Sequence, residues 1–379
     1  MLVREFGGTD SPAFKENVDS SWTKLKAPIE KKIILNDVAA MSAMRKACIP
    51  EQAALFDSFS SSTRNTRRWA QATAINVITS DLPAEQTMAT VEVNLQSLTR
   101  DFGAYIAISQ LFGKDFLDRY PALLEDFWKF DNDLFPLLVT GIPSWAPFKT
   151  IKYGMAARTR PIHELEALNR RIIQYQHGQP VEFDADMSDI SEAALDRSKI
   201  YKRDGWSFTE RAAADLAILW GQNANTQPVL FWFLAYVFST PACVFETYLM
   251  VNEPTSIRLA TRFVTVSDGD LKHELKPGMF ISVPHSLINH DLSRFLHPDP
   301  DSGKLLARYG KLKPWSSGVG MCKGRPWAEK ETLCLGAAII SLWDIEPTNG
   351  TWKLPAMMPG TAVKKPVEDI PVLIKRRTW

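Results

Sequence analysis

The sequence contains few cysteines, and their spacing excludes two common roles. Four cysteines are scattered over 379 residues, without a Cys-x-x-Cys pair or a ligand-like spacing to histidine: Cys48, Cys243, Cys322 and Cys334. Structural zinc sites use such pairs, and disulfide frameworks use a higher density of cysteine in a shorter chain. The sequence therefore predicts neither, and it indicates a protein of a reducing compartment.

A long apolar run and a strong charge imbalance are also missing. The longest apolar stretch, Val229 to Phe238, is far shorter than the roughly 20 residues of a membrane-spanning helix. The first 22 residues contain several charges and no apolar block, so we expect no secretory signal peptide. A net charge of +1 argues against broad nucleic-acid binding. With 45% hydrophobic residues, the chain is long enough for one large core or for two domains.

The periodicity of apolar residues predicts a mostly helical protein. Three segments have apolar residues at helical spacing: 91–113, 119–130 and 161–176. Three later segments are short, rich in β-branched residues and bounded by turns, as strands are: 261–266, 279–283 and 372–375. The polar, acidic segment 178–204 is predicted to be a surface loop. We therefore predict the α+β class, mainly α with a small β part.

One cysteine lies in a glycine-rich loop that leads directly into a predicted helix. The residues of this loop that matter for the argument are an aromatic, three glycines and the cysteine: Trp315, Gly318, Gly320, Gly324 and Cys322. Glycine allows a positive φ and a close approach of the main chain to a flat cofactor. The helix after Cys322 would direct unpaired N–H groups and its positive dipole end toward the sulfur, which lowers a thiol pKa. Cys322 is therefore a candidate thiolate ligand to iron; the alternative is a small, buried hydrophobic residue.

The segment from Ser207 to Phe238 predicts one long helix with an unusual centre. Ser207 followed by Glu210 is a capping-box start, and at ~1.5 Å per residue the helix would be roughly 45 Å long. Residues 219–228 contain several amide side chains, and Pro228 removes a backbone donor. A polar, weakened turn in an apolar helix is costly unless it faces a cavity. A kink with satisfied polar groups is the alternative.

These two segments resemble parts of the cytochrome P-450 superfamily. The spacing aromatic, two residues, Gly, three residues, Cys, one residue, Gly resembles its haem-thiolate loop, here 315–324, which implies that Cys322 is the axial iron ligand. Helix 207–238 resembles the distal, oxygen-side helix, most closely in the branch of bile-acid 7α-hydroxylase-type and prostacyclin-synthase-type enzymes, where asparagine takes the place of an acid. The resemblance implies that Asn225 and Thr226 handle protons at iron-bound oxygen.

Other segments resemble the family in order and spacing. Residues 256–262 resemble the segment whose arginine pairs with a haem propionate, which implies that role for Arg258. Residues 324–331 resemble the start of the proximal helix. Basic residues surround the cysteine loop, and they suit either an acidic redox partner or a solvated rim: Lys311, Lys313, Lys323, Arg325 and Lys330.

The sequence also departs from the family pattern. The nearest match to the family's Glu-x-x-Arg motif begins at Glu246, but it has Leu249 where the family has arginine. The N-terminal anchor and the first sheet have no counterpart, and the resemblance covers the chain from about Val91 onward with internal gaps. We therefore predict a single domain over residues 1–379 with an incomplete cytochrome P-450 fold.

The resemblance implies a haem-thiolate monooxygenase. It would use haem b with a cysteine thiolate ligand, electrons from NADPH through cytochrome P-450 reductase, and a small hydrophobic substrate such as a steroid, a terpenoid or another lipid-like molecule. Aromatic residues near the distal turn suit such a pocket or ordinary core packing: Trp220, Phe231 and Trp232. The family suggests an intracellular location at the endoplasmic reticulum membrane. A non-catalytic haem-binding remnant and an isomerase of peroxides or epoxides are the alternatives, and Thr226 favours oxygen activation over the isomerase.

Overall fold

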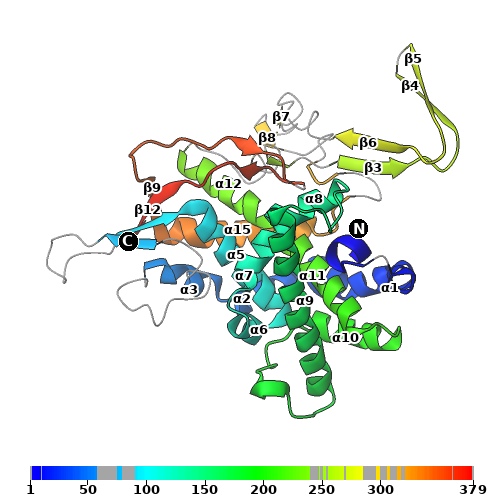
Figure 1. Ribbon diagram of the computed structural model, residues 1–379. Coiled ribbons are helices and arrows are strands. Elements are labelled where there is room, and N and C mark those ends of the chain that lie inside the picture. The colour runs from blue at the N-terminus through cyan, green and yellow to red at the C-terminus, as the bar shows by residue number, and fades with distance from the viewer. Residues whose placement is uncertain are drawn as a thin grey trace.

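The helices of the protein lie together in one body, and the strands lie along one side of it (Figure 1). The structure is a computed structural model that describes residues 2–9, 11–57, 75–78, 90–239, 247, 251–252, 255–268, 270–284, 296–298, 305–307, 314–316, 321–360 and 362–377. The longer helices are α1 (Pro12–Ile29), α2 (Asp37–Lys46), α5 (Leu95–Phe112), α9 (Lys149–Gln176), α10 (Glu192–Arg203), α11 (Phe208–Asn223), α12 (Thr226–Ser239) and α15 (Arg325–Leu342).

Shorter helical segments connect these helices. They are α3 (Ile49–Ala53), α6 (Lys114–Arg119), α7 (Leu123–Lys129) and α8 (Phe135–Val139), the π-helical turns η1 (Leu2–Phe6), η2 (Glu30–Ile34) and η4 (Phe130–Leu134), and the 3-10 turns η3 (Ala54–Asp57) and η5 (Glu182–Asp184). No helix in the part of the chain that the structure describes combines the length and the apolar character needed to cross a bilayer.

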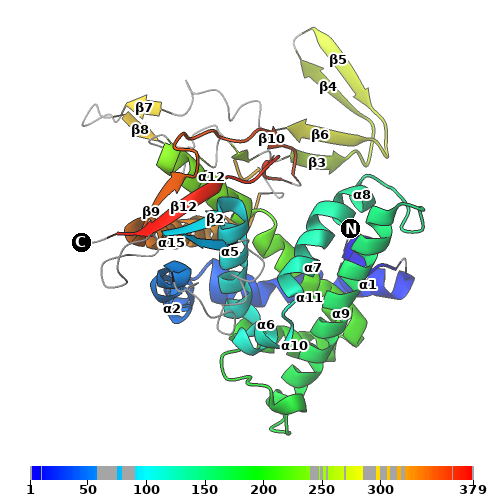
Figure 2. The same ribbon diagram turned by 60° about the vertical axis from the view of Figure 1, so that its left-hand side comes forward.

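The strands form small antiparallel sheets. The largest has the order β1 (Ile75–Ile78), β2 (Thr90–Asn94), β12 (Pro371–Arg376) and β9 (Trp343–Pro347). Two-stranded sheets join β3 (Thr255–Leu259) to β6 (Phe280–Pro284), β4 (Val264–Asp268) to β5 (Leu271–Leu275), β7 (Leu296–Pro298) to β8 (Leu305–Ala307), and β10 (Met357–Met358) to β11 (Lys365–Pro366). The β4–β5 hairpin extends away from the helical body in both views (Figures 1 and 2). The prediction of a mainly α structure with a small β part is confirmed.

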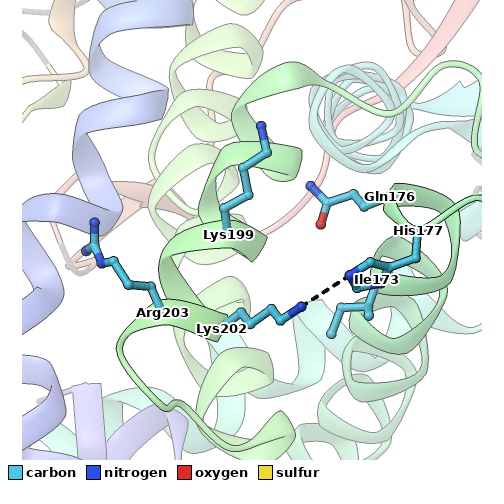
Figure 3. Close-up of a pocket in the computed structure, with 6 residues that line it drawn as sticks. All are labelled: Ile173, Gln176, His177, Lys199, Lys202 and Arg203. Atoms are coloured by element: carbon cyan, nitrogen blue, oxygen red, sulfur yellow. Dashed lines mark hydrogen bonds between the residues drawn. The ribbon is translucent and has the colours of Figure 1, made fainter.

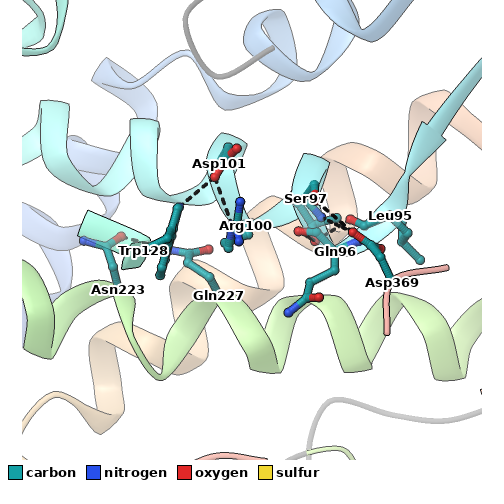
Figure 4. A network of polar contacts seen from close by, with 10 residues as sticks. Leu95, Gln96, Ser97, Arg100, Asp101, Trp128, Asn223, Gln227 and Asp369 are labelled. Atoms are coloured by element: carbon teal, nitrogen blue, oxygen red, sulfur yellow. Dashed lines mark hydrogen bonds and ion pairs between the residues drawn. The ribbon is translucent and has the colours of Figure 1, made fainter. Parts of the chain in front are cut away.

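The start of α5 differs from the predicted helix over 91–113. Residues 90–94 form β2 instead, because the buried Val91 and Val93 alternate with half-buried neighbours and pair with β12. The helix begins at Leu95, where the Asp369 carboxylate accepts hydrogen bonds from the backbone N–H groups of Gln96 at 2.6 Å and Ser97 at 2.9 Å (Figure 4). The strand turns into the helix at this cap.

The predicted surface loop at 178–204 is wrong over its second half. Helix α10 occupies residues 192–203 and packs on α1. Its buried face contains Arg197, whose side chain donates to the Leu25 carbonyl at 2.8 Å and to the Asp215 carboxylate at 2.6 Å. The burial of this helix depends on an ion pair, which apolar periodicity does not reveal.

Candidate functional site

The long helix predicted over 207–238 is two helices with a break between them. Helix α11 starts with the predicted capping box: the Ser207 hydroxyl accepts from the Glu210 N–H at 3.3 Å, and Glu210 accepts from the Ser207 N–H at 2.7 Å. The last helical bond runs from the Ala224 N–H to the Trp220 carbonyl at 2.9 Å, and α12 begins two residues later at Thr226. Pro228 offers no N–H to the Ala224 carbonyl, which explains why one continuous helix does not form.

Two of the amide side chains at this break donate hydrogen bonds to neighbouring groups. Gln222 donates to the Ala107 carbonyl of α5 at 2.9 Å, and Gln227 donates to the Asn223 side chain at 3.2 Å. A Cβ at Gly103 would lie 1.9 Å from the Gln227 oxygen, so α12 and α5 approach closely here. Asn223 and Gln227 lie beside each other below α5 in Figure 4. The interpretation as a satisfied polar kink thus holds for the amide N–H groups of Gln222 and Gln227, but their side-chain oxygens are buried without a partner in the described part of the chain.

Asn225 and Thr226 lie directly at the break. The Asn225 side-chain oxygen is buried and has no hydrogen-bond partner in the described part of the chain. Thr226 is 7% exposed. Leaving a buried acceptor unsatisfied costs about 1–3 kcal/mol. At the break, the Asn225 oxygen can therefore still accept a hydrogen bond that no described residue donates.

The geometry around Cys322 agrees with the predicted approach of a helix start to the sulfur. The Cys322 N–H donates to the Trp315 carbonyl at 3.0 Å, which closes the loop between them. The backbone N–H groups of Gly324 and Arg325, at the start of α15, donate to the Cys322 sulfur. Both bonds lower the thiol pKa, as does the positive charge of Arg325.

The net pKa shift of Cys322 is nevertheless upward, which corrects the predicted lowering. Cys322 has exposed surface, but the chain packed around its sulfur disfavours the charged form, and this desolvation outweighs the hydrogen bonds. In the protein alone, Cys322 is thus a neutral thiol at neutral pH. A bound metal cation would reverse this balance, because coordination deprotonates a thiol.

Of the three glycines in the loop, only Gly324 lies among the described residues. Gly324 has φ −73°, which any residue can adopt, so it does not use the positive φ that glycine allows. A Cβ at Gly324 would lie 3.6 Å from the Cys322 sulfur, so glycine keeps the space beside the sulfur open. Gly318 and Gly320 lie outside the described residues. Trp315 is half-buried and packs against the hydrophobic core.

The helix that follows Cys322 packs directly on the helix that carries Thr226. A Cβ at Gly336 of α15 would lie 2.5 Å from the Phe233 ring of α12, so glycine is required where the two helices meet. They lie side by side in both views (Figures 1 and 2). Two segments about 100 residues apart in the sequence are thereby brought onto neighbouring helices.

The remaining predicted site residues are described less completely. Arg258 lies in β3, where its main chain pairs with Ile281 of β6. The Glu246 motif, Lys311 and Lys313 lie outside the described residues. Lys330 pairs with Asp37 at 2.8 Å.

The aromatic residues near the break pack in the hydrophobic core or against it. Phe231 and Trp232 are 0% exposed, and the Trp232 ring N–H donates to the Lys364 carbonyl at 2.9 Å. The Trp220 ring N–H donates to Asp131 at 2.9 Å. Of the two interpretations, core packing is the one these contacts support.

Sequence reasoning missed a buried acid on α15. Glu331 is 0% exposed, and burial raises its pKa to about 8, although the Trp327 ring N–H acts in the opposite direction. An acid on the apolar face of a predicted helix was the available signal. Strongly shifted pKa values mark functional sites or unusual structural positions.

A hollow on the surface lies away from these residues. Figure 3 shows its lining, which comes from the end of α9 and from α10: Ile173, Gln176, His177, Lys199, Lys202 and Arg203. The Lys202 ammonium lies 3.1 Å from a His177 ring nitrogen. Lys199 and Arg203 are neutralised by Asp196 and Asp204. None of the predicted site residues lies on these two helices.

Comparison with known proteins places these features in a family context. No family model matches the chain. A cytochrome P-450 monooxygenase, efuG, of Hormonema carpetanum is 24% identical, over 72% of this chain and 62% of that protein. Another, poxD of Penicillium oxalicum, is 24% identical over 65% of this chain and 56% of that protein. A 25-hydroxycholesterol 7-alpha-hydroxylase of Rattus norvegicus is 23% identical over 59% of this chain and 63% of that protein.

The fold has a counterpart among solved structures. The crystal structure of P450BioI in complex with hexadec-9Z-enoic acid ligated acyl carrier protein has a TM-score of 0.57 at 10% identity, covering 93% of this chain and 78% of that chain. The predicted fold type is thus confirmed. The chain spans about three fifths of the length of the curated relatives it matches.

Proposed function

The chain belongs to the cytochrome P-450 superfamily, and we propose that it is a haem-thiolate monooxygenase that hydroxylates a small hydrophobic substrate. The observation that carries the proposal is the Cys322 sulfur at the start of α15, where two backbone N–H groups donate to it. Helix α15 packs on α12, which begins at Thr226. These features support one site with the sulfur on one side and the helix break on the other.

The residues around Cys322 fit a haem iron ligand. A thiolate needs donors that stabilise its charge, and the N–H groups of Gly324 and Arg325 supply them. Gly324 leaves space beside the sulfur that a larger side chain would fill. By resemblance to the family, Trp315 and Gly318 complete the loop, and Arg258 pairs with a propionate. When bound, haem with a thiolate ligand supplies the oxidation of a C–H bond by O2.

Asn225 and Thr226 are the residues we assign to proton handling. Both lie at the helix break, and the Asn225 side-chain oxygen is free to accept a hydrogen bond from water. The Thr226 hydroxyl can accept one proton and donate another, whereas the Asn225 amide has no ionisable proton. We therefore assign Asn225 to the orientation of water and Thr226 to the transfer of the proton.

The relatives support a proposal for the substrate and the partners. A rat relative is named for a sterol, 25-hydroxycholesterol, and the others listed above are fungal monooxygenases. We propose a steroid, a terpenoid or a similar lipid as substrate, cytochrome P-450 reductase with NADPH as the electron source, and the endoplasmic reticulum membrane as the location. Lys323 and Arg325, beside Cys322, would contribute to the face that binds an acidic partner.

A reduced-CO difference spectrum tests the ligand assignment. The full chain is purified, loaded with haem, reduced and exposed to CO, together with Cys322→Ser and Cys334→Ser. Cys334 is a matched control because it is also a free cysteine, half-buried on α15. We expect the Soret band typical of thiolate ligation in the wild type and in Cys334→Ser, and its loss in Cys322→Ser. The same band in Cys322→Ser would remove the assignment.

Turnover separates the monooxygenase from its two alternatives. With NADPH and reductase, the monooxygenase forms a hydroxylated product. An isomerase of peroxides or epoxides works without them, and a non-catalytic haem-binding protein shows the spectrum without turnover. Product formation that does not require NADPH would contradict the proposal.

A further inference from the structure

A side chain from another segment is bonded to the loop that carries Cys322. Asn252 is 4% exposed, and its side-chain amide donates to the Pro314 carbonyl at 3.1 Å. The next residue, Trp315, accepts the Cys322 N–H at 3.0 Å. The bond from Asn252 therefore lies one residue from the bond that closes the loop around the sulfur.

The main chain around Asn252 is held by a second buried segment. Asn252 forms an antiparallel bridge with Val363, and the Lys364 N–H donates to the Val251 carbonyl at 2.9 Å. Both valines are buried. These contacts position Asn252 without involving the cysteine loop.

The second segment is in turn bonded to α12. The Trp232 ring N–H donates to the Lys364 carbonyl at 2.9 Å, and Trp232 is fully buried. Hydrogen bonds between neighbouring residues thus lead from α12 through Lys364 and Asn252 to the loop of Cys322. Because α12 begins at Thr226, this path joins the two sides of the proposed site.

The amide N–H is the part of the Asn252 side chain that contributes a bond here. The side-chain oxygen is buried and has no hydrogen-bond partner in the described part of the chain. A buried acceptor without a partner is costly, so an apolar side chain of similar shape would be more favourable unless the N–H group had a use. The bond to the Pro314 carbonyl is such a use.

A metal ligand needs support from outside the coordinating residue. Distances from a metal to its protein ligands vary by only about 0.2 Å, so the ligand has to be held in place. Contacts beyond the ligating group provide this orientation. On one side of Cys322, the start of α15 holds the sulfur through backbone N–H groups. On the other side, the bond to Trp315 depends on where Asn252 holds Pro314.

We propose that Asn252 is a positioning residue for Cys322, and that it keeps the sulfur in place for coordination by holding the Pro314 end of the loop. This role rests on the proposed function, in which the sulfur binds haem iron. Without the Asn252 amide, the loop loses its bond to the segment paired with Val363, and in part of the molecules the sulfur no longer reaches the iron. A purely structural bond would affect stability and leave the ligand of each bound haem unchanged.

Amide exchange in the chain without haem tests whether Asn252 holds the loop. Isotope-labelled cysteine gives one amide signal for each of the four cysteines, and Cys322→Ser identifies the signal of Cys322. In Asn252→Leu, which keeps a branched side chain and removes the donor, we expect the Cys322 N–H to exchange at least tenfold faster than in the wild type. The Cys334 amide, within α15, is the internal reference and should not change. An unchanged Cys322 exchange rate in folded Asn252→Leu overturns the proposal.

The reduced-CO difference spectrum of the haem-loaded chain tests the position of the sulfur. In Asn252→Leu, we expect the fraction of bound haem that shows the thiolate Soret band to fall at least twofold. Asn169→Leu is the matched control, because Asn169 of α9 is also buried and its side chain also donates to a carbonyl, that of Leu165 at 2.9 Å. It should lower stability and leave this fraction unchanged. An unchanged fraction in Asn252→Leu, or an equal fall in Asn169→Leu, overturns the positioning role.

Failure of the proposed function gives a different result. If haem in the wild type shows no thiolate band, the ligand assignment is wrong, whereas exchange of the Cys322 N–H in the chain without haem still decides whether Asn252 holds the loop. If Asn252→Leu does not fold, Asn252→Ser decides by the same two measurements, because its hydroxyl lies one covalent bond closer to the main chain than the asparagine amide nitrogen.

Discussion

Two polar regions, one in α11 and one at the break after it, differ in whether their buried oxygens have hydrogen-bond partners. In the middle of α11, both carboxylate oxygens of Asp215 are satisfied by Arg197, Tyr201 and Asn169, at distances of 2.6, 2.8 and 2.9 Å. Ten residues later, the buried Asn225 oxygen has no partner among the described residues. The Asp215 carboxylate is saturated by its neighbours, whereas the Asn225 oxygen can still accept a hydrogen bond, as the proposed role in proton handling requires.

The largest expected effect on stability is at a third buried polar group, Glu331 of α15, an acid with a pKa of about 8. In the unfolded chain its pKa is near 4.5, so between pH 4.5 and 8 the folded state retains a proton that the unfolded state releases. The free energy of unfolding should therefore fall as pH rises through this window, by up to about 5 kcal/mol in total, with full stability below it.

Urea unfolding of the wild type and of Glu331→Gln at several pH values checks this slope. Glu331→Gln should lose it, while Glu329→Gln, a half-exposed neighbour on the same helix, should retain it. Equal slopes in all three chains would show that Glu331 does not titrate in this range.

Asp215→Ala should show the effect of breaking the saturated region. The substitution leaves the Arg197 guanidinium, which is 1% exposed, without its carboxylate, and we expect a loss of about 3–5 kcal/mol in the free energy of unfolding. Chemical denaturation measures it, with the partly exposed Asp196→Ala on α10 as the control, expected within about 1 kcal/mol of the wild type. A small effect of Asp215→Ala would mean that the buried Arg197 guanidinium does not depend on this carboxylate.

Asn225→Leu should change the free energy of unfolding in the opposite direction to Asp215→Ala. Removing a buried acceptor without a partner should raise the free energy of unfolding by about 1 kcal/mol. Gln227→Leu is the control: its buried oxygen likewise has no partner among the described residues, but its amide donates to Asn223 at 3.2 Å, and loss of that bond should lower stability. Destabilisation by Asn225→Leu would indicate that its oxygen already has a structural partner.

Thr226→Val should have the smallest effect on stability, within about 1 kcal/mol, because the shape of the side chain is retained. Its effect on turnover should be large, on the order of a hundredfold, if the hydroxyl transfers a proton. The ratio of product to NADPH consumed is the informative measurement, since loss of proton transfer wastes electrons. Unchanged turnover would assign Thr226 to packing.

Much of this organisation could be predicted from local patterns. The Ser207 capping box, the weakened turn before Pro228 and the helix start beside Cys322 each depend on residues within one or two turns. The satisfaction of Gln222 by α5 and the burial of α10 through Arg197 depend on contacts between distant segments. Local periodicity contains no information on such contacts, so 178–204 was predicted as a loop.

The Cys322 pKa shows the same limit. The sequence indicated the donors near the sulfur, and those donors are present. The desolvation that outweighs them is a property of the assembled fold, which composition and spacing do not determine.

The central claim is that the Cys322 sulfur is the protein ligand of a haem iron. Iron K-edge X-ray absorption of the haem-loaded chain measures this bond directly. We predict a sulfur neighbour of iron in the wild type and in Cys334→Ser, and its replacement by nitrogen or oxygen in Cys322→Ser. An iron–sulfur bond that survives in Cys322→Ser, or is missing from the haem-loaded wild type, would contradict the account.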